Sequence, residues 1–277
     1  MTTVPGSSPR PQAPPPLPQQ LKPRRELRLA SAQAHELGPV WTQPFGRLLL
    51  GQVAPVVGKT TLLDVMCHSG YPGLELLRRF PEARLFAVDP SAALIEQARR
   101  NAGELLGRRV FLRTEPGEPN LPFDEAVYDL VVSNLGLYDA AQPQLLLKEL
   151  ARVAKPGAQV VATLPLRGTF AEFYALLEAE LTGREVERKR LLGHLQSWPD
   201  VETVRGWAKL AGLDEIELVV SPFSLLFAGA AELFYSPLIE HGPMPALRAL
   251  CGDSRGELQA VFSALRERIE QICGGEG

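Results

Sequence analysis

Short apolar runs alternate with amphipathic stretches through the middle of the chain. The runs have the length of buried strands, and they lie at 60–65, 85–88, 110–113, 128–133 and 159–164. The stretches between them have the apolar spacing of helices, at 72–80, 91–102 and 144–153. Ser91 is suited to cap the helix at 91–102, and Lys155-Pro156-Gly157 ends the helix at 144–153. This alternation predicts a parallel α/β sheet, and right-handed crossovers make it a doubly wound sandwich.

The flanking regions have a different pattern. The pattern at 26–51 predicts a helix and a segment that leads to the first strand, with Trp41 and Phe45 as apolar anchors. After residue 166 the chain is mostly helical, and residues 215–227 predict two strands bent at Ser221-Pro222 that complete the sheet. The predicted helices of this part lie at 170–181, 185–195, 201–210, 230–241 and 257–272.

The first 25 residues differ in composition from the rest. Eight of them are proline and none is aromatic, so this tail cannot bury enough apolar surface to offset its ordering entropy. We expect a disordered tail, in which PPPLP could engage an SH3-like partner but more often serves as a linker. The predicted organisation is therefore a tail at 1–25, a core at 26–166 and a helical lid with the final strands of the sheet at 167–277.

Composition and charge narrow the setting of the protein. The net charge of −3 over 277 residues does not indicate a surface for nucleic acid. The three cysteines have no CxxC spacing, so we expect no metal site, reduced thiols and a cytoplasmic location. The best apolar run, 218–231, is shorter than the roughly 20 residues of a membrane span, so we expect none.

The candidate chemistry lies where the first two strands end. In an open α/β sheet, ligands bind outside the carboxyl ends of the strands, at the point where the strand order reverses. The loop 66–73 and the loop that begins at Asp89 would flank such a crevice. Asp89 stands 25 residues beyond Asp64, and its carboxylate could accept hydrogen bonds from both hydroxyls of a ribose. The alternative role for Asp89 is to support Ser91 in capping the following helix.

Four segments resemble, in order and spacing, the class I S-adenosylmethionine-dependent methyltransferases. The similarity covers about residues 40–165 and is nearest to the type 11 group, which includes quinone-biosynthesis and malonyl-carrier methyltransferases. The four segments are DVMCHSG (64–70), FAVDPSAALIEQAR (86–99), LPFDEAVYDLVVSN (121–134) and LLLKELARVAKPGAQVV (145–161). The resemblance implies a Rossmann-like fold and S-adenosylmethionine as the cofactor.

The resemblance also implies which residues contact that cofactor. The backbone of 67–70 would lie near the methionine moiety, Asp89 would bind the ribose, and Glu118 or the competing Glu115 would reach the adenine amino group. Pro90 would lie beside the adenine, and the residues after the fourth strand would border the methyl donor. The implied set is Asp64, Cys67, His68, Ser69, Gly70, Asp89, Pro90, Glu118, Asn134 and Leu135.

The first of these segments departs from the family pattern at two positions. Met66 and His68 stand where the family has glycines, and a left-handed backbone there costs roughly 1–2 kcal/mol for any other residue. Either the loop takes a modified path and still binds the cofactor, or the two side chains fill the pocket. The first case predicts methyl transfer to a small-molecule or carrier-bound acceptor, and the second predicts a non-catalytic binding or scaffold protein.

No catalytic residue follows from the sequence. Methyl transfer gains much of its acceleration from alignment of the acceptor with the methyl group, so it does not require a strong base. His68 could act as a base but would stand beside the cofactor instead of the acceptor, so the catalytic residues stay unassigned.

Overall fold

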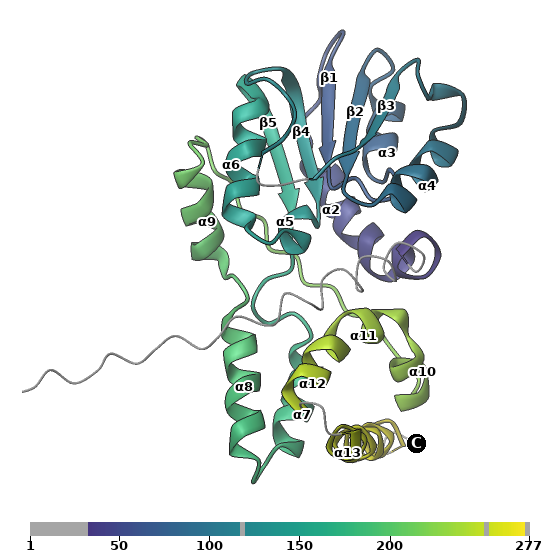
Figure 1. The fold of residues 1–277 in the computed structure, drawn as a ribbon, viewed down its shortest axis with the longest axis vertical. Helices are drawn as coiled ribbons and strands as arrows, with labels where there is room; N and C mark the ends of the chain where they lie inside the picture. The colour runs from purple at the N-terminus through teal and green to yellow at the C-terminus, as the bar shows by residue number, and fades with distance from the viewer. Residues whose placement is uncertain (1–32, 117–119, 252–254, 275–277) are drawn as a thin grey trace, which may run out of the picture.

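The computed structural model describes residues 33–116, 120–251 and 255–274. Within these ranges, five parallel strands form one sheet in the order β3-β2-β1-β4-β5 (Figure 1). This order reverses between β1 and β4, which confirms the predicted doubly wound sandwich. The strands are β1 (Thr61–Val65), β2 (Arg84–Asp89), β3 (Val110–Thr114), β4 (Tyr128–Asn134) and β5 (Ala154–Thr163).

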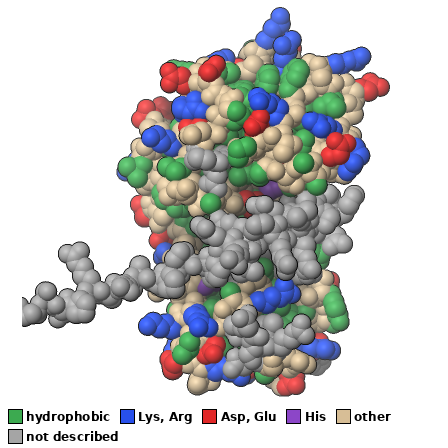
Figure 2. All heavy atoms as spheres, viewed as in Figure 1, with side chains coloured by type: hydrophobic (Ala, Val, Ile, Leu, Met, Phe, Trp, Pro, Cys, Tyr) green, Lys and Arg blue, Asp and Glu red, His purple; other side chains and the backbone are tan. Residues whose placement is uncertain are grey.

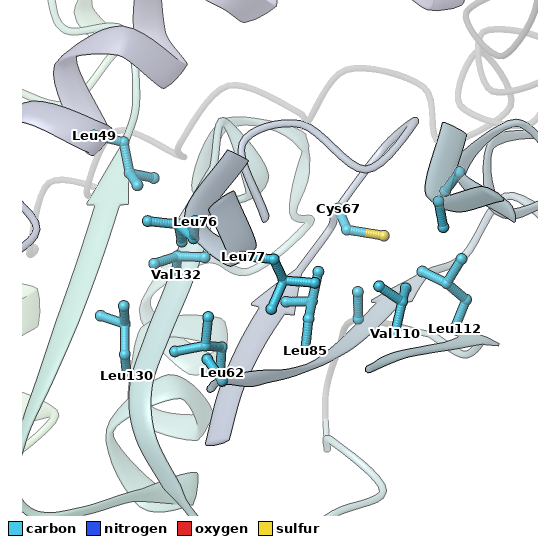
Figure 3. Packing of buried hydrophobic residues seen from close by; sticks show 14 of the residues in the cluster. Leu49, Leu62, Cys67, Leu76, Leu77, Leu85, Val110, Leu112, Leu130 and Val132 are labelled. Carbon is cyan, nitrogen blue, oxygen red and sulfur yellow. The ribbon is translucent and has the colours of Figure 1, made fainter. Parts of the chain in front are cut away.

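Helices cover both faces of the sheet. Because successive side chains of a strand point to opposite faces, Leu62 packs into one core cluster and Leu63 into the other. The first cluster holds residues of α2 (Gln43–Gln52), α3 (Gly73–Arg79) and α4 (Ala92–Ala102), and Figure 3 shows its packing. The second holds residues of α6 (Pro143–Val153) and α9 (Val201–Leu210), so part of the chain beyond residue 166 returns to cover the sheet.

The described helices from residue 171 onward, apart from α9, form a second body beyond the carboxyl edge of the sheet (Figure 1). Their shared apolar core includes Leu177, Leu191 and Leu265. The helix predicted at 230–241 is interrupted at Ser236, because Pro237 cannot continue a helix and begins a new one. The helices of this body are α7 (Ala171–Glu180), α8 (Glu185–Gln196), α10 (Ala230–Tyr235), α11 (Pro237–His241), α12 (Pro243–Cys251) and α13 (Arg255–Gly274).

The two strands predicted at 215–227 are wrong, and in the described part of the chain the sheet ends with β5. The segment has no regular secondary structure. Pro222 removes a backbone donor that a strand ladder would use. Leu225 and Phe227 instead pack against the cluster that contains Trp41. These two side chains therefore contact a helix cluster instead of a strand, while Val219, Val220 and Leu226 are exposed.

The two bodies meet at an aromatic cluster near the start of the described chain. The π-type helix η2 (Gln33–Thr42) leads into α2, and Trp41 and Phe45 are buried as predicted. They pack with Leu135 of the core and Leu238 of the helical body. The predicted tail at 1–25 lies outside the described residues, so its disorder and its partner stay predictions.

The surface shows no segregation of charge on the side visible in Figure 2, where basic and acidic side chains are interspersed over both bodies. Of the helices in the described ranges, none combines the length and apolarity needed to cross a membrane.

Candidate functional site

The loops after β1, β2 and β4 converge where the strand order reverses. The loop after β1 passes through left-handed backbone conformations at Met66 (φ 59°), His68 (φ 50°) and Gly70 (φ 96°). Leu135, between β4 and the short helix α5 (Gly136–Asp139), is left-handed as well (φ 65°). Met66 and His68 therefore adopt the backbone conformation that glycine favours, at about 1–2 kcal/mol each.

The Met66 side chain is accommodated by a glycine on the neighbouring loop. It is buried, and a Cβ atom added to Gly136 would lie 2.9 Å from the Met66 Cβ atom. Met66 thus packs tightly against the start of α5, and part of its strain is offset by burial of its side chain.

Asp64 is fully buried at the end of β1. Its Oδ2 accepts a hydrogen bond from the Gly73 N–H at 3.1 Å, whereas Oδ1 has no hydrogen-bond partner among the described residues. A Cβ atom on Gly73 would lie 2.5 Å from Oδ2, so this close approach requires glycine. Burial raises the pKa of Asp64 to about 7, although the nearby His68 and the Gly73 hydrogen bond act in the opposite direction.

Asp89 is held by two backbone amides at the end of β2. Oδ2 accepts from the His68 N–H at 2.9 Å and Oδ1 from the Ser91 N–H at 2.8 Å. Burial raises the pKa of this carboxyl group, and both hydrogen bonds counter that effect in part. Ser91 Oγ accepts from the Leu94 N–H at 3.3 Å, so the predicted cap of α4 is confirmed. The supporting role of Asp89 is present, yet each oxygen keeps a second lone pair for a ligand.

The His68 ring spans from the β1 loop to the β4 loop. Its Nε2 atom lies 3.1 Å from the Asn134 carbonyl oxygen and 3.7 Å from Asp139 Oδ2, and the residue is 6% exposed. Because a carbonyl oxygen only accepts hydrogen bonds, Nε2 carries the proton in this contact. The ring therefore lies between the two strand ends at which open α/β sheets bind ligands.

The Asn134 side chain has structural partners on other elements. Its Nδ2 donates to the Thr42 carbonyl oxygen at 3.0 Å, and its Oδ1 accepts from Thr163 Oγ1 at 2.7 Å. Thr163 Oγ1 also accepts from the N–H of the buried Leu135 at 3.1 Å. Only the backbone carbonyl of Asn134 faces His68, so the amide itself is not presented to the crevice.

The other predicted site residues differ in their surroundings. The Cys67 thiol is buried, and burial raises its pKa, so only the backbone of Cys67 is suited to contact a ligand. Ser69 accepts a hydrogen bond from Asn101 through its carbonyl oxygen, and Pro90 is exposed beside Asp89. Glu118 lies outside the described residues, and its competitor Glu115 pairs with Arg113 at 2.6 Å. Their cofactor contacts stay predictions.

Asp139 lies beside His68 at the candidate site, although the sequence pattern did not point to it. It lies on α5, which was not predicted because four residues are too few for a periodic pattern. Its position five residues after Asn134 was the available signal, because the loop after a strand next to the reversal of strand order borders the crevice.

A closed circuit of aromatic and imidazole rings, called here the aromatic circuit, includes Tyr138 of α5. Neighbouring ring centroids are 5.5 to 6.5 Å apart. Within it, Trp198 Nε1 donates to His194 Nε2 at 3.3 Å, and the Tyr174 hydroxyl lies 3.1 Å from the same nitrogen. Burial lowers the pKa of His194, which favours its neutral form. The members are Trp41, Tyr138, Phe170, Tyr174, His194 and Trp198.

Comparison with known proteins finds related methyltransferases. Residues 62–157 match the sequence profile of a family described as "Methyltransferase domain". A demethylmenaquinone methyltransferase of Clavibacter sepedonicus is 30% identical over 177 residues, which cover 60% of this chain and 69% of that protein. A malonyl-[acyl-carrier protein] O-methyltransferase of Halorhodospira halophila is 34% identical over 151 residues, which cover 52% of this chain and 50% of that protein.

The similarity therefore spans about half the length of the malonyl-carrier relative and somewhat more of the demethylmenaquinone relative. A chain from a complex of the Haloferax volcanii Trm112 methyltransferase activator superimposes with a TM-score of 0.53 at 22% identity. The alignment covers 70% of this chain and 77% of that chain, which shows a shared fold.

Proposed function

Since the chain belongs to the class I S-adenosylmethionine-dependent methyltransferases, we propose that it binds S-adenosylmethionine at the carboxyl ends of β1, β2 and β4. We propose further that it transfers the methyl group to a small-molecule or carrier-bound acceptor. The observation that carries the proposal is the buried Asp89 carboxylate, held by the His68 and Ser91 amides at the end of β2.

The residues present fit this cofactor. The remaining lone pairs of Asp89 suit ribose hydroxyls, which are donors. The Asn134 carbonyl oxygen and the Asp139 carboxylate lie on the β4 side of the crevice, near the same His68 nitrogen. Both are acceptors of the kind that suits a positively charged group, and S-adenosylmethionine carries an ammonium and a sulfonium. The Asp64 Oδ1 atom is a further buried acceptor whose partner is missing among the described residues.

When bound, the cofactor supplies an electrophilic methyl group on a positively charged sulfur. Asp89, the Asn134 carbonyl and Asp139 would hold the cofactor, and the chemistry it would supply is transfer of this methyl group to a lone pair of the acceptor. The task of the chain is then to orient the acceptor and exclude water. His194, the neutral imidazole of the aromatic circuit, already engages Trp198 and Tyr174, so we assign no catalytic base.

The acceptor is proposed to lie between the core and the helical body, against the aromatic circuit. Tyr138 of the circuit is followed in the chain by Asp139, whose carboxylate lies 3.7 Å from the His68 ring nitrogen at the crevice. Apolar walls with a few polar atoms are typical of small-molecule sites. The names of the relatives point to a quinone precursor or a carrier-bound malonyl group as starting choices for an acceptor screen. We also propose a cytoplasmic location, supported by a buried and unpaired Cys67.

Calorimetric titration with S-adenosylmethionine tests the proposal. We expect saturable binding, and we expect Asp89→Ala to weaken it by about 1–3 kcal/mol, the scale of a lost charged hydrogen bond. Asp214→Ala, which removes an exposed carboxylate in the turn after α9, is the matched control and should bind like the parent protein. Equal affinities for parent and Asp89→Ala would remove Asp89 from the site.

A second candidate function is that of a non-catalytic binding protein with this fold. It is favoured by one observation, the buried His68 ring that lies between the ends of β1 and β4 in contact with Asn134. In that case folded protein gives no heat with S-adenosylmethionine at high micromolar concentration. Such a result would contradict the methyl-transfer proposal.

A further inference from the structure

We propose that the His68 side chain is a built-in plug, which occupies the acceptor pair formed by the Asn134 carbonyl and the Asp139 carboxylate until a positively charged ligand group displaces it. This inference rests on the proposed function, because it identifies S-adenosylmethionine as the ligand that competes with the ring. It adds a residue that sets affinity at the site.

The backbone directs the ring toward β4. His68 is left-handed at φ 50°, and its own N–H is bound to Asp89 at 2.9 Å. The ring then extends across the crevice, with Nε2 3.1 Å from the Asn134 oxygen and 3.7 Å from Asp139 Oδ2. One residue thus contacts the ends of β2 and β4 at once, through its amide and its ring respectively.

The ring and the cofactor require the same kind of partner. A protonated ring nitrogen and an ammonium group are both hydrogen-bond donors, and a carbonyl beside a carboxylate accepts either. While the ring holds this position, the binding-competent fraction of the protein is reduced. The apparent dissociation constant then rises by the reciprocal of that fraction.

The walls of the crevice do not depend on the ring. Asn134 is held by Thr42 and Thr163, and Ser133 Oγ donates to the Val65 carbonyl oxygen at 2.8 Å. The contact between residue 68 and Asp89 uses a backbone N–H, which every residue except proline retains. Replacement of His68 by glycine should therefore remove the plug and leave the site assembled, and glycine also adopts φ 50° without strain.

The test compares the parent protein with His68→Gly by calorimetric titration with S-adenosylmethionine and with S-adenosylhomocysteine. We expect His68→Gly to bind S-adenosylmethionine at least tenfold more tightly. The matched control is Ala126→Gly, which relieves a similar left-handed residue (φ 57°) that is exposed on the loop before β4. Its affinity should equal that of the parent, which shows that relief of strain alone has no effect.

The outcomes separate the plug from the proposed function. Tighter binding by His68→Gly than by the parent supports the plug. If only His68→Gly binds the cofactor, the plug is still supported, and the methyl-transfer proposal fails for the parent protein. Weaker or equal binding by His68→Gly overturns the plug, while binding by the parent keeps the proposed function. Absence of binding by both folded proteins overturns both.

A measurement on the parent protein covers the case in which His68→Gly does not fold. The ring protons of His68 should shift in the NMR spectrum on saturation with S-adenosylmethionine, because the ring leaves its buried position. The signals of His194, which belongs to the aromatic circuit, provide an internal comparison. Unchanged His68 signals in a saturated sample would overturn the plug.

Discussion

At the scale of single residues, Asp64 shows how burial changes a carboxyl group. The ordinary pKa of this group is 3.8, and burial in the folded protein raises it to about 7. Between these two pH values the folded protein keeps a proton that the unfolded chain has lost. The free energy of unfolding therefore falls as the pH rises through this window.

Asp64→Asn tests this dependence on pH, because it keeps an acceptor for the Gly73 N–H and removes the titrating carboxyl group. We expect the variant to gain stability relative to the parent between about pH 4 and about pH 7, as measured by urea denaturation across this range. A difference that is the same at pH 4 and at pH 8 would contradict the raised pKa.

Asp129→Asn is the matched control with the opposite sign. Partial burial acts against the anion of Asp129, but hydrogen bonds from Lys155 and Thr61 lower its pKa below 3.8 overall. Its stabilising contribution is present above the unfolded pKa and is lost as the pH falls through the folded pKa. Asp129→Asn should therefore cost more stability at pH 8 than at acidic pH.

At the scale of elements, α6 is fastened to the loop before β4 by hydrogen bonds from two ion-paired side chains of the helix. Glu149 accepts from the Leu121 N–H at 2.8 Å and pairs with Arg152 at 2.7 Å. Arg152 donates in turn to the carbonyl oxygens of Leu121 and Phe123. The segment LPF, read from the sequence as part of a family motif, thus has a defined contact with a helix 28 residues away.

We expect Glu149→Ala to lower the free energy of unfolding by about 1–3 kcal/mol, because it leaves the Leu121 N–H without its acceptor and removes the carboxylate that pairs with Arg152. Chemical denaturation measures the loss. The neighbouring Lys148→Ala removes an exposed side chain of the same helix and should change stability by at most about 0.5 kcal/mol. Equal effects of the two variants would show that the ion pair contributes little.

At the scale of the whole molecule, Trp41 connects the core with the helical body. It is 9% exposed, stacks on Phe170 at a centroid distance of 5.5 Å and meets Tyr138 at 6.2 Å. Leu238 of α11 belongs to the same cluster. Trp41 of η2 is therefore one of the side chains that join the helical body to the carboxyl edge of the sheet.

Trp41→Ala should destabilise the helical body by about 3–5 kcal/mol, the usual cost of removing a buried Trp side chain. Amide hydrogen exchange should then accelerate in α7 and α11. Trp207→Ala is the control, because Trp207 packs in the second core cluster with residues of α6, where its loss should appear. If both variants accelerate exchange in the same helices, the role of Trp41 as the connection is wrong.

Features that depend on neighbouring residues were predicted from the sequence, whereas features that depend on contacts between distant residues were not. The strands, the helices between them and the Ser91 cap follow from periodicity and capping, which act over a few residues. The family followed from four segments, and the place of Asp89 followed from the end of the strand that precedes it. The apolar residues at 215–227 failed as a guide, because a strand also needs a partner edge, and Leu225 and Phe227 pack on a helix cluster instead.

The sequence by itself determined the doubly wound core, the family and the two residues that replace glycines after β1. Only the tertiary structure decided what those residues do, because their partners come from distant parts of the chain. His68 meets an oxygen 66 residues away, and the Asn134 amide is taken by Thr42, 92 residues away. Left-handed backbone is a local cost that can be read from a sequence. The partners of a side chain depend on which loop the fold places opposite it.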